Sequence, residues 1–162
     1  MFFVNVLISF YSHTGNTKKI AERLKACLEA KSFSVTLHEI KPKGNASPKE
    51  ISKMGSVLLE KPVPDISGFD LVFVGTPVWG MMPCPVVVSF LKALPMFRAK
   101  KFVLFASCHA FTGSAIKKMS GLLSIKGARV IDSFSVKSLF ALNEKNLKKA
   151  DVFCEKLVSA LS

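Results

Sequence analysis

Apolar runs alternate along the chain with segments whose apolar residues recur at helical spacing. Residues 2–10 form a largely apolar run with β-branched members, which is typical of a strand covered on both faces. Similar short runs predict four more strands, at residues 34–40, 71–74, 101–106 and 128–136. Strands that alternate with helices indicate β-α-β units, and therefore a parallel sheet with right-handed crossovers.

Four segments between these strands, or after them, have the pattern of helices. They are residues 17–31, residues 85–94, residues 112–123 and a final helix whose apolar face carries Leu147, Ala150, Cys154, Leu157, Val158 and Leu161. Ser47-Pro48-Lys49-Glu50 predicts a further helix start, because serine is a favoured cap and glutamate three residues later completes a capping box. No repeat or low-complexity segment interrupts the pattern, so we expect one α/β domain over residues 1–162.

Charged residues are absent from three stretches of this otherwise basic chain. The 162 residues include 23 Lys and Arg against 11 Asp and Glu, a net charge of +12. Residues 1–17, 71–91 and 102–116 contain none of them. Each stretch consists of a predicted strand and the loop that leaves its carboxyl end. Because such loops gather at one edge of a parallel sheet, we expect a neutral, partly apolar ligand site there.

The same stretches exclude a membrane-spanning helix. Residues 71–91 are long enough to cross a bilayer, but their glycines and prolines would leave unpaired backbone groups in hydrocarbon. Residues 1–17 lack the cationic start and the cleavage site of a signal peptide. The cysteines show no metal-binding or CxxC spacing, and we interpret them as reduced thiols of a cytoplasmic protein; they are Cys27, Cys84, Cys108 and Cys154.

The basic residues do not form a nucleic-acid stripe. They are spread over most of the predicted helices in short groups such as Lys18-Lys19, Lys117-Lys118 and Lys148-Lys149. Short groups of this kind are typical of solvated helix faces. We therefore expect no specific nucleic-acid partner.

The segment between the first strand and the first helix has the composition of an anion-binding loop. Ser12, Thr14 and Thr17 supply hydroxyls, and Gly15 permits a tight turn into a helix N-terminus that attracts negative charge. The loop contains neither a GxxxxGK[ST] pattern nor GxGxxG, so a single phosphomonoester fits it better than a triphosphate. The alternative is an ordinary strand-to-helix turn with a threonine cap.

Three loops of the chain together resemble the flavodoxin-like family. Phe10-Tyr11-Ser12-His13-Thr14-Gly15-Asn16-Thr17 resembles the family's FMN phosphate loop. The second and third matches are Gly75-Thr76-Pro77-Val78-Trp79-Gly80 and Ser107-Cys108-His109-Ala110-Phe111-Thr112-Gly113. The resemblance implies a doubly wound, five-stranded parallel sheet in the order 2-1-3-4-5, with helices on both faces.

The resemblance also implies FMN as the cofactor, and it implies a role for each loop. The phosphate would be held by Ser12, Thr14, Asn16 and Thr17 with the backbone of His13 and Gly15. The flavin ring would lie along Thr76, Pro77, Val78, Trp79 and Gly80, and its pyrimidine side would face Ser107, Cys108, His109 and Phe111. Trp79, predicted to lie in a loop, is either the stacking ring or a plug packed on the core. His13, His109 and Cys108 have either a proton or thiol role or a purely structural one.

Three functions are compatible with these residues. The first is an FMN-binding electron-transfer protein, an oxidoreductase whose basic surface would attract an acidic redox partner. The second is a small NAD(P)H-dependent quinone or flavin reductase, although the chain has no evident extra element for a nicotinamide. The third is a non-catalytic flavodoxin-like binding scaffold. Flavodoxins are generally acidic, whereas the three loops here have no acidic residue, so we expect a less negative potential for full flavin reduction.

Overall fold

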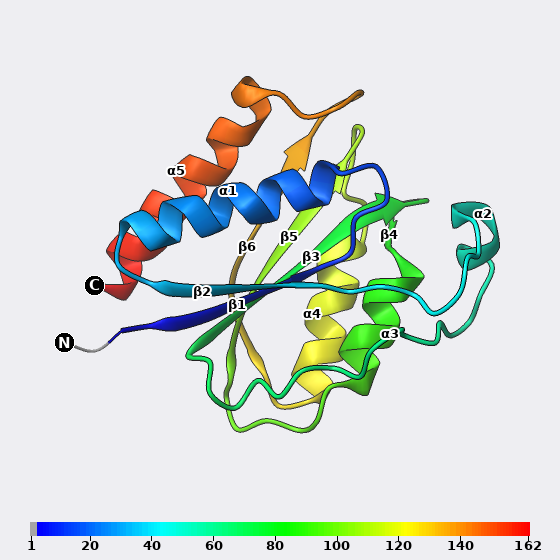
Figure 1. The fold of residues 1–162 in the computed structure, drawn as a ribbon, viewed down its shortest axis with the longest axis horizontal. Coiled ribbons are helices and arrows are strands. Elements are labelled where there is room, and N and C mark those ends of the chain that lie inside the picture. Colours follow the sequence, from blue (N-terminus) through cyan, green and yellow to red (C-terminus); the bar gives the residue numbers. More distant parts are fainter. Residues whose placement is uncertain (1–2) are drawn as a thin grey trace.

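Five parallel strands form the centre of the molecule. The computed structural model describes residues 3–162. The strands lie in the order β2 (Ser34–Glu39), β1 (Asn5–Phe10), β3 (Leu71–Trp79), β5 (Lys101–Cys108) and β6 (Arg129–Lys137) (Figure 1). Counted over the parallel strands, this is the predicted order 2-1-3-4-5, which is confirmed. A two-residue strand, β4 (Met82–Pro83), pairs antiparallel with the end of β3.

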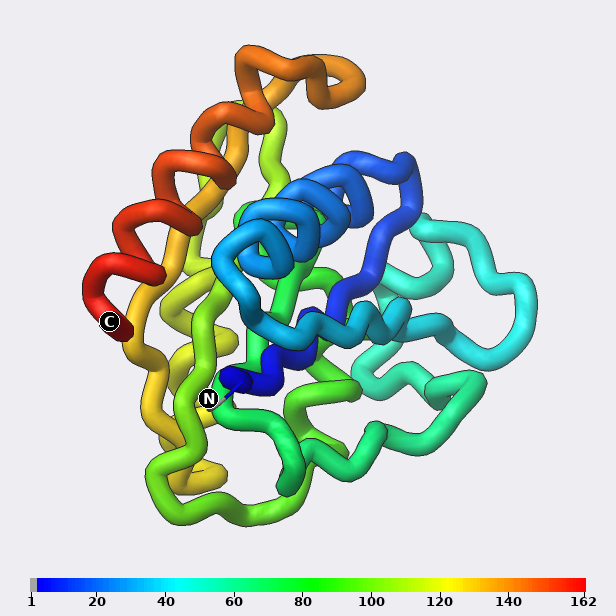
Figure 2. The backbone as a smooth tube through the Cα atoms, turned by 60° about the vertical axis from the view of Figure 1, so that its left-hand side comes forward, coloured from blue at the N-terminus to red at the C-terminus, as the bar shows by residue number. Residues whose placement is uncertain are grey.

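Helices cover both faces of the sheet, as predicted. On one face α1 (Asn16–Ala30) and α5 (Glu144–Leu161) lie side by side, and on the other α3 (Pro85–Ala93) packs beside α4 (Ala115–Ile125) (Figures 1 and 2). The single-turn α2 (Pro48–Ile51) lies beyond the sheet, in the connection from β2 to β3.

Alternation along the strands divides the buried side chains into two cores. In β1, Val6 and Ile8 belong to the core beneath α1 and α5, whereas Leu7 belongs to the core beneath α3 and α4. Successive residues of a strand point to opposite faces, so a strand that is apolar throughout serves both cores. This explains why the central strands appear in the sequence as unbroken apolar runs.

Helix boundaries follow their capping residues. Ser47 accepts a hydrogen bond from the Glu50 backbone N–H, and the Glu50 carboxylate accepts one from the Ser47 N–H, so the predicted capping box is present. Asn143 and Asn146 form the equivalent pair at the start of α5. The helix predicted at residues 112–123 instead begins at Ala115, because the preceding residues form a turn.

Trp79 lies in a strand, so its predicted loop position is wrong. β3 continues past Gly75, where the sequence indicated its end, and turns through residues 80–81 into β4. The neighbouring β1 pairs with β3 only as far as Gly75, whereas β5 pairs as far as Pro77. Beyond Gly75 the strand is therefore an edge on one side, where proline is tolerated because no donor is needed.

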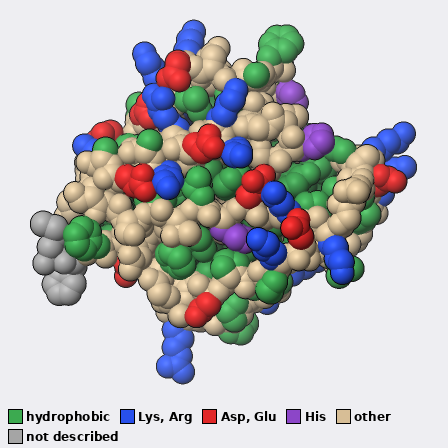
Figure 3. Space-filling view, viewed as in Figure 1, with side chains coloured by type: hydrophobic (Ala, Val, Ile, Leu, Met, Phe, Trp, Pro, Cys, Tyr) green, Lys and Arg blue, Asp and Glu red, His purple; other side chains and the backbone are tan. Residues whose placement is uncertain are grey.

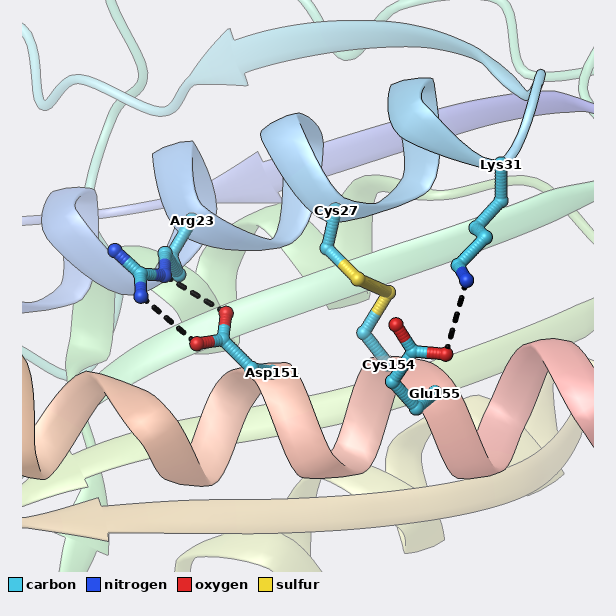
Figure 4. The surroundings of a disulfide bond; sticks show 6 residues. All are labelled: Arg23, Cys27, Lys31, Asp151, Cys154 and Glu155. Atoms are coloured by element: carbon cyan, nitrogen blue, oxygen red, sulfur yellow. Dashed lines mark hydrogen bonds and ion pairs between the residues drawn. A yellow bond between two sulfur atoms is a disulfide. The ribbon is translucent and has the colours of Figure 1, made fainter.

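The interpretation of all four cysteines as reduced thiols is also wrong. Cys27 of α1 and Cys154 of α5 form a disulfide between the two helices, and only Cys84 and Cys108 are free thiols among residues 3–162 (Figure 4). The two linked cysteines are 127 residues apart in sequence. Spacing along the chain carries no signal for such a pair, which is created by the packing of α1 against α5.

Residues 71–91 do not form a single helix but divide into β3, β4 and the start of α3. Within residues 3–162, the structure contains no helix with the length and apolarity needed to cross a membrane.

Candidate functional site

A pocket of about 290 Å³ opens at the carboxyl edge of the sheet. Its walls come from the loops that follow β1, β5 and β6 and from the last residues of β3, β5 and β6. The lining residues are His13, Thr14, Asn16, Pro77, Val78, Trp79, Ser107, Cys108, His109, Val136, Ser138, Phe140, Ala141 and Leu142. None of them is Asp, Glu, Lys or Arg, so this part of the structure has the neutral lining that the sequence predicted.

The first wall is the turn from β1 into α1. Gly15 occupies the N-cap of α1 with a left-handed φ of 92°, and it supplies no side-chain cap. The first N–H groups of a helix have no partners within the helix, and among them only that of Lys18 is bonded here by a side chain, the Ser12 hydroxyl, at 3.2 Å. The N–H groups of Asn16 and Thr17 start the helix beside the pocket. A helix N-terminus without a cap suits an anion.

A buried hydroxyl pair joins the first wall to the third. Thr17 Oγ1 and Ser107 Oγ lie 2.7 Å apart in a hydrogen bond. Thr17 is 1% exposed and does not line the pocket, although the sequence assigned it to the phosphate directly. Its hydroxyl fixes the position of Ser107, which does line the pocket.

The second wall is the hairpin formed by β3 and β4. Thr76 Oγ1 donates to the Pro77 carbonyl at 2.9 Å and accepts from the Cys84 N–H at 3.0 Å, which fixes the hairpin from behind. The indole of Trp79 meets the ring of Tyr11 edge to face, with centroids 6.0 Å apart. Trp79 thus packs on the core and also lines the pocket, so the core packing of one alternative is present and the stacking role of the other stays a prediction.

The third wall is the end of β5, with Ser107 and Cys108, and the first residue after it, His109. The Cys108 thiol is nearly buried and donates to the Val136 carbonyl, at an S–O distance of 3.9 Å. Burial raises the pKa of this thiol, and the charges of Lys137 and Lys149 only partly oppose the shift. The geometry therefore favours a neutral packing thiol at this position over a reactive thiolate.

The fourth wall consists of residues 138–142, which were not predicted from the sequence to belong to the site. We call this segment the strap. Asn16 holds it in place: its side-chain oxygen accepts from the Leu142 N–H at 3.1 Å, and its amide donates to the Phe140 carbonyl at 3.4 Å. Lys19 adds an ammonium bond to the Leu142 carbonyl at 3.3 Å. The loop after every parallel strand on this side of the sheet is a candidate wall, and that topological rule was the available signal.

The structure therefore brings together nine of the residues that the sequence assigned to the site and leaves six outside the pocket lining. The nine are His13, Thr14, Asn16, Pro77, Val78, Trp79, Ser107, Cys108 and His109. Ser12, Gly15, Thr17 and Thr76 support the walls from behind, and Gly80 lies on the outer side of the hairpin. Phe111 is 71% exposed, with the Lys137 ammonium 5.7 Å from its ring centre.

The sequence of most of the strands and loops that form this pocket matches a known protein family. The flavodoxin family model named Flavodoxin_4 matches residues 5–133, most of the chain. The chain belongs to the flavodoxin family. The match ends before the strap and α5, so one wall of the pocket lies outside the matched region of this flavodoxin.

Solved structures are similar in fold to this chain over nearly its whole length. Oxidised flavodoxin 1 from Bacillus cereus is 20% identical, with a TM-score of 0.70 over 98% of this chain and 99% of that one. A putative flavoprotein from Bacteroides eggerthii DSM 20697 is 18% identical, with a TM-score of 0.71 over 95% and 98% of the two chains. At these identities the likeness shows the fold. A comparison with curated protein sequences gives no match.

Proposed function

We propose that this flavodoxin binds FMN in the pocket and acts as an electron carrier. The observation that carries the proposal is the combination, in one pocket, of an uncapped helix N-terminus with a neutral wall that includes an indole ring. A phosphate needs the first of these and a flat, partly apolar ring needs the second. The donors present fit the group, since hydroxyls and backbone N–H groups satisfy a phosphate without a lysine in the loop.

Each wall has a task in this proposal. Thr14 and the N–H groups at the start of α1 would hold the phosphate. Trp79 would lie along the ring, and the backbone near His109 would meet its polar edge. FMN supplies a ring that accepts and returns electrons. The strap, held by Asn16, would exclude water from the fourth side of the pocket.

The charges around the pocket influence both its potential and its partner. Its lining has no carboxylate, so we expect the reduced, negatively charged flavin to meet less repulsion than in flavodoxins with acidic loops. The bound cofactor should then have a less negative potential. The nearby cations Lys18, Lys49 and Lys137 would attract an acidic redox partner, and this attraction should weaken with salt.

The test is a titration of the purified protein with FMN, followed by flavin fluorescence. Binding should be weakened about tenfold or more in Trp79→Ala, because the indole is the largest ring in the lining. Phe111→Ala is the matched control: it removes an exposed ring outside the pocket and should keep the affinity. Absence of FMN uptake by the unmodified chain would overturn the proposal.

A second measurement separates a carrier from a reductase. If the protein is a carrier, the FMN-loaded form should show negligible steady-state turnover with NADH or NADPH and a quinone. Rapid turnover would instead favour the reductase function while leaving the cofactor assignment intact.

A further inference from the structure

One continuous part of the chain holds a large share of the positive charge and no negative charge. Residues 71–131 contain eight of the 23 lysines and arginines and none of the 11 acidic residues. They form β3, β4, α3, β5, α4 and the start of β6. The five ion pairs of the described residues join side chains of α1, α5 and β6, and none involves a cation from residues 71–131.

Two loops of this segment are joined at the amino edge of the sheet. They are residues 95–100, before β5, and residues 126–128, before β6; together with Ile125 at the end of α4 we call them the basal tip. The Phe97 N–H donates to the Lys126 carbonyl at 2.6 Å, and the Ala99 N–H donates to the Gly127 carbonyl at 3.0 Å. In Figure 1 the two loops meet at the lower edge of the molecule. These bonds make the tip one fixed surface rather than two independent loops.

The basal tip exposes two large aliphatic side chains. Met96, in the first loop, is 70% exposed, and Ile125, the last residue of α4, is 74% exposed. Phe97, next to Met96 in the first loop, packs on Phe102 of β5, with ring centres 5.6 Å apart. The exposed pair therefore stands on a rigid apolar base.

Cations flank this pair along the chain. Lys92, Arg98, Lys101 and Arg129 are exposed, and Lys126 is half-buried with its ammonium on the Lys92 carbonyl at 2.8 Å. Lys101 and Arg129 are direct neighbours across the β5–β6 ladder. Three carboxylates near this edge of the sheet each have a partner. Asp65 accepts from the Ser67 N–H, Asp70 accepts from the Asn5 N–H, and Asp132 lies 3.5 Å from Lys156.

We propose that the basal tip docks on an anionic phospholipid bilayer. Met96 and Ile125 would enter the headgroup region, and the flanking cations would meet lipid phosphates and acidic headgroups. Exposed aliphatic side chains flanked by cations match a surface that is apolar beneath and negative above. A nucleic-acid backbone offers the negative charge but gives no partner to the two aliphatic side chains.

Docking by the basal tip would leave the pocket open. The tip lies at the amino ends of β5 and β6, and the pocket lies at their carboxyl ends. The eight residues of β5 separate the two edges by roughly 25 Å at about 3.3 Å per residue. A protein bound to lipid in this way presents its pocket to the aqueous phase, where an acidic partner could reach it.

The test is sedimentation of the protein with vesicles, which needs no flavin. Binding should be strong with vesicles of phosphatidylglycerol and phosphatidylcholine, absent with phosphatidylcholine alone, and much weaker at 0.5 M salt, about the ionic strength at which exposed charges are screened. Two variants of the tip are compared: M96S/I125S, which keeps the charge, and R98Q/K101Q, which keeps the apolar pair. Each should bind the anionic vesicles at least tenfold more weakly.

The matched control is K148Q/K149Q, which removes two exposed cations from α5 on the opposite face. It should bind the vesicles as the unmodified protein does. Equal losses in this control and in R98Q/K101Q would show a dependence on net charge alone and overturn the proposal. No binding to anionic vesicles, or tighter binding to duplex DNA that survives M96S/I125S, would overturn it as well.

Discussion

The pairs of helices on the two faces of the sheet are held together by different interactions. On one face, α1 and α5 are joined by a disulfide and by ion pairs on either side of it, Arg23 with Asp151 and Lys31 with Glu155 (Figure 4). On the other face, α3 and α4 are held by apolar burial, with no acidic residue in either helix. In Figure 3 acidic and basic side chains lie next to one another over the part of the surface where Figure 1 places α1 and α5.

This difference shows where the net charge of +12 comes from. Residues 71–131 contribute +8 of it, and the rest of the chain, with most of the length, is closer to balance. Charges that are paired within the protein contribute to its stability, whereas unpaired charges of one sign repel one another and attract outside partners. The four predictions below test this division, from the largest expected effect to the smallest.

The disulfide should give the α1–α5 face its largest single stabilisation. Reduction by dithiothreitol is expected to lower the free energy of unfolding by about 2–4 kcal/mol, because the bond closes a long loop of chain. Urea denaturation with and without the reductant measures this. In the double variant C27S/C154S the reductant should leave the free energy of unfolding unchanged within experimental error. A large change in that variant would contradict the pairing.

Substitution of two glycines, one in a crowded site beneath α1 and α5 and one in an open site on α4, should change stability in opposite directions. A Cβ at Gly75 would overlap the buried ring of Phe105, which is itself stacked on Phe134. Gly75→Ala should therefore cost about 1–3 kcal/mol of stability by overpacking. Gly121, exposed in α4, has open space around it, and Gly121→Ala should stabilise by about 0.5–1 kcal/mol. Thermal unfolding measures both effects. A lower melting temperature for Gly75→Ala and a higher one for Gly121→Ala would support this packing, and shifts of the same sign would contradict it.

The Arg23–Asp151 pair should make stability depend on pH. The Arg23 guanidinium bonds both carboxylate oxygens of Asp151, at 2.7 and 2.8 Å, and holds the pKa of this carboxyl below its ordinary value of 3.8. A lowered native pKa stabilises the fold above the ordinary value, and this contribution is lost as the pH falls below it. Asp151→Asn should cost about 0.5–1 kcal/mol at pH 7 after solvent screening.

The same variant should cost progressively less below pH 4, where the carboxyl of the unmodified chain becomes protonated. Chemical denaturation from pH 7 down to pH 3 measures the difference. A cost that stays constant over this range would show that Asp151 acts by packing and not by its charge.

Charge removal should have opposite effects on the two faces. Lys118→Gln on α4 should raise stability slightly at low salt, because it relieves repulsion in an acid-free region. Lys25→Gln on α1 should lower stability by no more than about 0.5 kcal/mol, because it breaks the i,i+4 pair with Glu29. Both changes should vanish in 0.5 M salt, which screens exposed charges. Denaturation midpoints at two salt concentrations measure both changes. A change of the same sign in the two variants would contradict this expectation.

The sequence predicted what depends on local pattern and on strand order. Apolar runs identified all five parallel strands, and the Ser47 and Glu50 capping box was visible directly. The course of β3 past Gly75 was not predicted, because Pro77 argues against a central strand but is tolerated at an edge. Pairing of Cys27 with Cys154 depends on helix packing across 127 residues, which no local pattern encodes.

The candidate site divides in the same way. The loop from β1 into α1 was visible because its residue types and its position before a helix both indicate anion binding. The strap has no such composition, and Asn16 was assigned to the phosphate although its side chain bonds the strap backbone. The burial of Thr17 against Ser107 was equally hidden, since hydroxyl residues in a loop give no sign of which partner they face.

The measurement that tests the central claim most directly is the flavin content of the purified protein. The account predicts a yellow protein that releases FMN when it is denatured, or an apoprotein that takes up one FMN per chain and quenches its fluorescence. A colourless preparation that binds no FMN at micromolar concentrations, with its fold intact by circular dichroism, would contradict the account.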